Sequence, residues 1–141
     1  MSKQLPGRRV ALDAGGRRIG LAVSDELGMV ASPVRTIDLK REGLDGLIAA
    51  IRQYEPVEII IGMPTGMSGH EGPQADAVRL FAGEVAEKID LPITYWDERL
   101  TTFAADMALQ ESGHRSRKSR KEYVDAVAAS LILQSFLDSV R

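Results

Sequence analysis

The stretch VALDAGGRRIG, residues 10–20, decides how the chain begins to fold. Three apolar residues, typical of a buried strand, run straight into Asp13, and the GGRR that follows is typical of a turn. A buried carboxylate is costly unless something pairs with it. Three partners or roles are open for Asp13: the metal of a phosphate-binding loop, a catalytic metal, or only a place in the turn.

The bulk composition fits a single domain, residues 1–141, because 44% hydrophobic and 27% charged residues allow a core without covalent staples. Cysteine is absent and there are only two histidines, which excludes a disulfide framework, a thiolate zinc site and an all-histidine metal site. The start, MSKQLPGRR, lacks the apolar run of a secretory signal, and no segment approaches the roughly 18 apolar residues of a membrane span. We expect a cytoplasmic protein without membrane contact.

The net charge of −2 is unevenly distributed. The segment SGHRSRKSRK, residues 112–121, has no acidic residue and five of the 18 basic ones, which leaves 13 basic against 20 acidic residues elsewhere. A basic run is commonly a solvated loop, but its isolation in an acidic chain favours phosphate binding. The five candidates for binding a nucleic-acid backbone are Arg115, Arg117, Lys118, Arg120 and Lys121.

The order of the predicted elements indicates an α/β fold. Three strands in close succession, residues 8–14, 19–25 and 29–37, predict an antiparallel meander, and Pro33 suggests an edge position for the third. Strands and helices alternate afterwards, which favours parallel crossovers and a mixed five-stranded sheet flanked by helices. The later predicted elements are a helix at 43–54, a strand at 56–64, a helix after residue 73, a strand at 91–98, and helices at 99–112 and 122–140.

Three more carboxylates stand out by their context. Asp97 and Glu98 end the last predicted strand, and Asp125 falls in the middle of the apolar stripe of the last helix at 100° per residue. Taken alone, Asp125 has the alternatives of a buried salt bridge or a helix N-cap. If the first and last strands lie near each other, their carboxyl ends share one rim, where carboxylates bind Mg²⁺ and metal ions assist phosphodiester cleavage.

With these residues the chain resembles the bacterial YqgF/RuvX family of Holliday junction resolvases and nucleases that mature the 5′ end of pre-16S ribosomal RNA. The matching pieces are LDAGGRRIGLAVSD, GMPTGMSGHEGPQA, PITYWDERLTT, SGHRSRKSRK and VDAVAASLILQSFL, in family order over nearly the whole chain. The resemblance implies an RNase H-like fold and a nuclease, endonuclease rather than exonuclease, that depends on Mg²⁺ or Mn²⁺. Its implied substrate is RNA, branched DNA or both, and resolving a two-fold symmetric junction requires a homodimer.

The resemblance also implies roles for particular residues. It makes Asp13, Glu98 and Asp125 the metal ligands and catalytic carboxylates, with Asp97 as the alternative to Glu98 because neighbouring strand residues point to opposite faces. Basic residues beside these carboxylates join the basic segment as candidates for nucleic-acid binding: Arg17, Arg18 and Arg99. The glycine-rich loop departs from the family's GLPLNMDG at Met63, Gly66 and Ser68, which puts in question any substrate contact assigned to the replaced asparagine.

Two other functions stay open beside the nuclease. Actin- and sugar-kinase-like ATP-binding domains begin with a similar phosphate-binding hairpin, but they need two such domains, and 141 residues supply one. The second alternative is a non-catalytic nucleic-acid-binding or ribosome-assembly module on the same fold. The altered glycine-rich loop leaves room for such a module, whereas retention of all three carboxylates argues against it.

Overall fold

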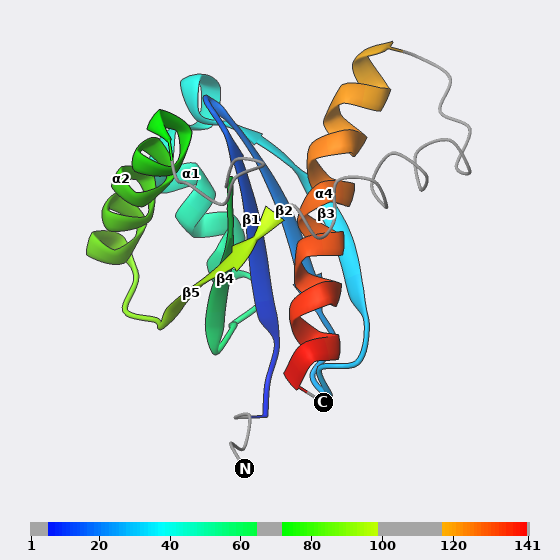
Figure 1. Ribbon diagram of the computed structural model, residues 1–141. Helices are drawn as coiled ribbons and strands as arrows, with labels where there is room; N and C mark the ends of the chain where they lie inside the picture. Colours follow the sequence, from blue (N-terminus) through cyan, green and yellow to red (C-terminus); the bar gives the residue numbers. More distant parts are fainter. Residues whose placement is uncertain (1–5, 65–71, 99–116, 141) are drawn as a thin grey trace.

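A mixed five-stranded sheet forms the centre of the molecule (Figure 1). The computed structural model describes residues 6–64, 72–98 and 117–140. The strand order is β3-β2-β1-β4-β5, with β1 antiparallel to β2 and parallel to β4. This confirms the predicted meander, its parallel crossovers and the edge position of Pro33. The elements are β1 (Arg9–Gly15), β2 (Arg18–Ser24), β3 (Ala31–Asp38), α1 (Leu39–Arg52), β4 (Glu58–Met63), α2 (Pro73–Lys88), β5 (Ile93–Asp97) and α4 (Arg117–Val140).

The β1–β2 hairpin sets the register on which the candidate site depends. Its turn consists of Gly16 and Arg17, and Gly16 has φ +66°, the sign that a tight hairpin needs at its first central position. This turn pairs Asp13 of β1 directly with Gly20 of β2. Because paired residues point to the same face of a sheet, Asp13 and the space above Gly20 share one face.

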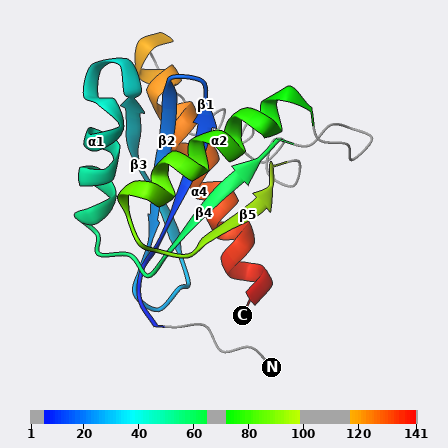
Figure 2. The ribbon, with the colours of Figure 1, turned by 90° about the vertical axis from the view of Figure 1, so that its left-hand side faces the viewer.

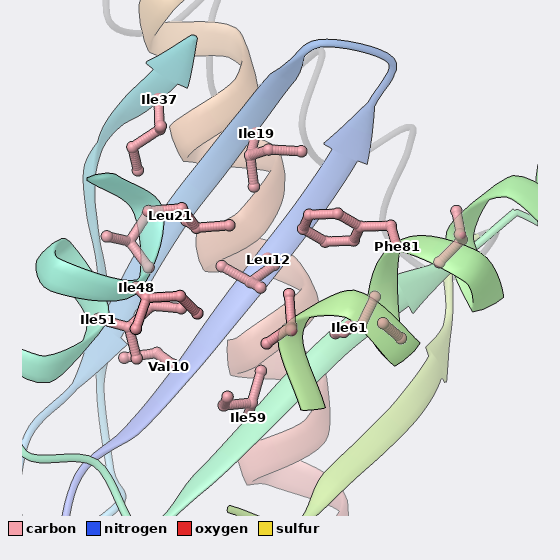
Figure 3. Packing of buried hydrophobic residues seen from close by; sticks show 14 of the residues in the cluster. Val10, Leu12, Ile19, Leu21, Ile37, Ile48, Ile51, Ile59, Ile61 and Phe81 are labelled. Carbon is pink, nitrogen blue, oxygen red and sulfur yellow. The ribbon is translucent and has the colours of Figure 1, made fainter. Parts of the chain in front are cut away.

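Large and small residues alternate along the strands and give the sheet two unlike faces. The face of Val10 and Leu12 carries large aliphatic side chains and packs against α1 and α2, as Figure 3 shows. The opposite face offers little more than Ala11, Ala22 and Ile60, and α4 packs there (Figures 1 and 2). The small residues let α4 come much closer to the sheet than a helix could over leucine or isoleucine.

The backbone of α4 rests on the backbone of β2 at Gly20. A Cβ atom at this position would lie 1.9 Å from the carbonyl oxygen of Asp125, so only glycine fits. Gly62 of β4 makes room for a side chain of the helix, because a Cβ there would lie 2.5 Å from Cδ1 of Ile132. The backbone contact at Gly20 places Asp125 directly over β2.

Both α4 and α1 begin earlier than the sequence predicted. Helix α4 starts at Arg117 rather than at residue 122, because the Arg and Lys of the basic segment are good helix formers. Asp125 therefore lies two turns inside the helix, which rules out the N-cap alternative. Helix α1 starts at Leu39, where the Asp38 side chain accepts a 3.0 Å hydrogen bond from the Lys40 backbone N–H, and it kinks at Gly43.

Residues Tyr123–Val140 of α4 reach the 18-residue length and the mean hydropathy, 1.2, of a candidate membrane span. The expectation that no segment approaches such a span was wrong for this helix. Its apolar side chains, however, form a buried cluster with Ala11, Ala22 and Ile60 of the sheet. The high hydropathy is therefore accounted for by a core helix packed on a sheet.

We predict that Gly20→Ala lowers the free energy of unfolding by about 1–3 kcal/mol, because the new methyl group meets helix backbone that cannot move alone. Urea denaturation followed by circular dichroism measures the change. Gly83→Ala in α2 is the matched control: its added methyl group meets nothing within 4 Å, and it should stabilise by up to about 1 kcal/mol. Equal stability of Gly20→Ala and wild type would contradict the close packing of α4 on β2.

Candidate active site

Asp13 and Glu98 meet at the carboxyl ends of β1 and β5, although β4 lies between these two strands. Glu98 crosses β4 at Gly62, since the Oε2 atom of Glu98 lies 3.7 Å from the place where a Cβ of Gly62 would be. The Glu98 carboxylate therefore lies over β4 next to Gly62, on its way to Asp13.

The Asp13 carboxyl keeps its proton at neutral pH and is hydrogen-bonded to Glu98. Burial raises the pKa of Asp13 to about 8, and the negative charge of Glu98, a hydrogen bond with Glu98 and the more distant charge of Asp125 act in the same direction. The protonated Asp13 carboxyl donates the hydrogen bond, because a carboxylate can only accept one. Two carboxylates that avoid being charged together are a common arrangement in sites that hold or move protons and cations.

Asp97 lies on the other side of β5 from this pair. Its neighbour Trp96 faces α4, where the indole N–H donates a 2.9 Å hydrogen bond to Ser135 Oγ and the ring meets Phe136 edge-on. Side chains alternate along a strand, so Asp97 faces the α2 side, as does Tyr95, which lies beneath the Arg79 guanidinium. The carboxylate that reaches Asp13 is therefore that of Glu98.

Asp125 is held by an ion pair with Arg18. The Arg18 Nη2 atom lies 2.7 Å from the Asp125 Oδ2 atom. That oxygen is buried, so water screens the attraction between the two charges only weakly. Burial raises the pKa of Asp125, while the charge of Arg18 and hydrogen bonds from Arg18 and Thr36 oppose the rise. The salt-bridge alternative for Asp125 is thus part of the structure.

Within the described ranges, no three carboxylate or histidine side chains are grouped closely enough to form a ready metal site. The structure brings Asp13 and Glu98 together and keeps Asp125 on Arg18. The Asp13–Glu98 pair nevertheless fits a hard divalent cation, because its oxygen donors suit Mg²⁺ or Mn²⁺ and a cation would replace the proton of Asp13. Asp125 is near enough for its negative charge to raise the pKa of Asp13.

A pocket of about 560 Å³ opens beside the carboxylate pair, between the ends of β1 and β4 and the first half of α2. Asp13 and Glu98 line one side of it, and Gln74 and Phe81 of α2 line another. The volume is in the range that small ligands occupy, and the lining combines a few polar groups with an apolar wall. The site is therefore a hollow with acidic oxygen atoms on one side.

The other predicted site residues fall in different places. Arg17 is well exposed and lies 3.5 Å from Asp38, away from the carboxylate pair. Met63 is buried in the core against α1 and α2, so this departure from the family pattern is a core substitution. The remaining predicted residues, or their side chains, lie outside the described part of the chain: Gly66, Ser68, Arg99, Arg115, Arg117, Lys118, Arg120 and Lys121.

The sequence reasoning missed four residues that shape this site. Gly20 and Gly62 make the room described above, Thr36 supports Asp125, and Gln74 lines the pocket. The signal for Gly20 was available, because a two-residue turn after Gly15 fixes its pairing with Asp13. No local pattern pointed to Thr36, which reaches Asp125 only through the packing of α4 on the sheet.

The raised pKa of Asp13 gives a pH-dependent prediction for the metal-free protein. The pKa of Asp13 is about 8 in the folded chain against an ordinary 3.8, so its protonated form favours folding below pH 3.8 and this contribution is lost as the pH rises to about 8. Asp13→Asn has no titratable proton at this position, so it does not undergo this loss. We predict that it becomes the more stable protein above pH 8, by an amount on the order of a few kcal/mol. Thermal unfolding in a chelator across this range measures the difference, and a constant difference would contradict the pairing.

Comparison with known proteins connects this geometry to a family. The family model described as "RuvX: Holliday junction resolvase" matches residues 7–139. A Lactococcus lactis protein named "Putative pre-16S rRNA nuclease" is 43% identical over 136 residues, covering 94% of each chain. A protein of the same name from Geobacillus kaustophilus is 44% identical over 138 residues, covering 95% of this chain and 99% of the relative.

The fold has solved counterparts as well. The structure of Thermus thermophilus RuvC in complex with a Holliday junction substrate aligns with a TM-score of 0.59, at 15% identity, over 95% of this chain and 96% of the other. At that identity the likeness concerns the fold, and it bears out the RNase H-like architecture. With the family model matching residues 7–139 and relatives above 40% identity along the same span, the chain belongs to the RuvX family.

Proposed function

We propose that this protein is a divalent-metal-dependent nuclease that hydrolyses phosphodiester bonds. The observation that supports this most is the half-buried, hydrogen-bonded pair of Asp13 and Glu98 at the rim of the sheet, where α/β proteins bind ligands. When both carboxylates are ionised they need a compensating positive charge, and a hard cation supplies it in an all-oxygen setting. The family and its curated relatives are described as nucleases and resolvases, which agrees with the proposal.

Three carboxylates would hold the cation: Asp13 and Glu98 directly, and Asp125 after a change of partner. When bound, Mg²⁺ or Mn²⁺ activates water and stabilises charge that develops on the phosphate. The chain's own part is to place acidic oxygens at the rim of a hollow and to exclude water on the α4 side, where the core is closed by Ile132 and Phe136. Arg18 and the basic segment at the start of α4 would position the phosphate backbone.

For the substrate we propose cytoplasmic 5′-end processing of pre-16S ribosomal RNA by endonucleolytic cleavage, with four-way DNA junctions as the competing substrate. The names of the relatives favour ribosomal RNA, and the description of the family model favours the junction. Resolving a two-fold symmetric junction takes two active sites, hence a homodimer. One cleavage assay with both substrates, together with a mass measurement in solution, distinguishes RNA processing from junction resolution. A monomer that cuts only RNA would rule out junction resolution.

We predict that Asp13→Asn lowers cleavage by at least about 10²-fold and leaves nucleic-acid affinity within a few-fold of wild type, because it removes a metal ligand but no phosphate contact. Single-turnover cleavage with Mn²⁺ and filter binding in a chelator measure the two quantities. Undiminished cleavage by the purified variant would rule out this site. Binding by the wild-type protein without metal-dependent product would instead favour the non-catalytic module.

Glu98→Gln and Asp97→Asn form a second, paired test. The two residues are neighbours with equal charge, yet only Glu98 reaches Asp13 and lines the pocket. We predict that Glu98→Gln loses cleavage to the same degree as Asp13→Asn, whereas Asp97→Asn keeps it within a few-fold. The reverse order of effects would assign the ligand to Asp97.

A further inference from the structure

The ion pair between Arg18 and Asp125 joins two residues that the proposed mechanism needs for different tasks. Arg18 is the first residue of β2 and lies on the same face as Gly20, because side chains alternate along the strand. Its guanidinium lies 2.7 Å from the Asp125 carboxylate. The side chains are 32% and 22% exposed, so part of each partner faces solvent, although the Oδ2 atom of Asp125 is itself buried.

The carboxylate of Asp125 can change partner only by turning its own side chain. Its backbone is fixed on Gly20, where not even a methyl group would fit between strand and helix. The guanidinium is equally restricted at its base, since Arg18 pairs with Gly15 at the closed end of the hairpin. The pair is therefore a local, reversible contact between two anchored side chains.

We propose that Arg18 is the counter-ion that holds Asp125 until a divalent cation at Asp13 and Glu98 takes its place, and that the released guanidinium then binds a phosphate of the nucleic acid. This inference rests on the proposed function and adds an order to it: cation first, phosphate contact second. Arg18 is then a positioning residue for the metal site and a binding residue for the substrate.

Charge and geometry support the exchange. A cation near Asp13 repels a guanidinium that already lies on the third carboxylate, so Arg18 and the cation compete for Asp125. The planar fork of an arginine matches a phosphate as well as a carboxylate, which gives the displaced group a ready partner. The adjacent Arg17 has a different partner, Asp38, at 3.5 Å, so the exchange concerns one of the two arginines of the hairpin.

Metal binding tests the first half of the proposal without any cleavage assay. In Mn²⁺ titrations followed by calorimetry, Arg18→Gln should bind Mn²⁺ roughly ten-fold more tightly than wild type, because the competing charge is gone. Arg18→Lys keeps the charge and should stay near wild type. In an Asp125→Asn background, Arg18→Gln should have no effect on Mn²⁺ affinity, since the contested carboxylate is absent.

The matched control is Arg35→Gln. Arg35 also forms an arginine–carboxylate pair, with Nη2 2.8 Å from Oε1 of Glu42, but this pair lies at the junction of β3 and α1. The substitution removes the same charge from a comparable contact outside the site, and Mn²⁺ affinity should not change. An equal increase in Arg35→Gln would attribute the effect to net charge and overturn the proposal.

Coupling between metal and nucleic acid tests the second half. The probe is a fluorescent single-stranded RNA with phosphorothioate linkages and 2′-O-methyl sugars, which resists cleavage. Saturating Mn²⁺ should strengthen its binding to wild type by roughly ten-fold, and this gain should vanish in Arg18→Gln. Arg18→Lys should recover only part of it, because an ammonium lacks the bidentate fork.

The outcomes separate this inference from the proposed function. If wild type and Asp13→Asn bind Mn²⁺ equally weakly, the proposed metal site is wrong. If wild type binds Mn²⁺ and Asp13→Asn does not, but Arg18→Gln binds it no more tightly than wild type, the competition of Arg18 with the cation is overturned. Circular dichroism checks that each variant is folded, and should Arg18→Gln unfold, a large change of Mn²⁺ affinity in Arg18→Lys would contradict the proposal instead.

Discussion

The contact between the backbone of α4 and the backbone of β2 at Gly20 governs where the functional groups of this protein lie. A hypothetical Cβ 1.9 Å from a carbonyl oxygen leaves no room for any other residue. The contact fixes the height of Asp125 above the sheet, and the hairpin register places Asp13 beside the same spot. Glu98 reaches Asp13 from two strands away and passes next to Gly62 of β4. The positions of the acidic residues therefore depend on the glycines of β2 and β4 that they lie beside.

Much of the fold followed from pattern alone. The apolar runs, the tight turn after Asp13 and the later alternation of helices and strands predicted the meander, the parallel crossovers and helices on both faces, as observed. The helical spacing of α4 correctly put Asp125 towards the protein. These features depend on neighbouring or regularly spaced residues, so they can be predicted from one sequence.

The remaining features depend on contacts between distant residues, which no local pattern records. The structure gives a physical reason why Glu98, and not Asp97, is the neighbour of Asp13. Strand β5 lies two strands from β1, and Glu98 passes next to Gly62 of the intervening β4. The pairing of Arg18 with Asp125 joins the first hairpin to the last helix. The start of α4 at Arg117 was missed because a run of basic residues is compatible with a solvated loop as well as with a helix.

The central claim is that Asp13 and Glu98 form a cation site that draws Asp125 away from Arg18. A crystal of the wild-type protein soaked in Mn²⁺ and measured at an anomalous wavelength tests it most directly. The account predicts an anomalous peak in contact with the Asp13 and Glu98 carboxylates, with the Asp125 carboxylate turned off the Arg18 guanidinium. No peak at these carboxylates at saturating Mn²⁺, or a peak there with the 2.7 Å pair unchanged, would contradict it.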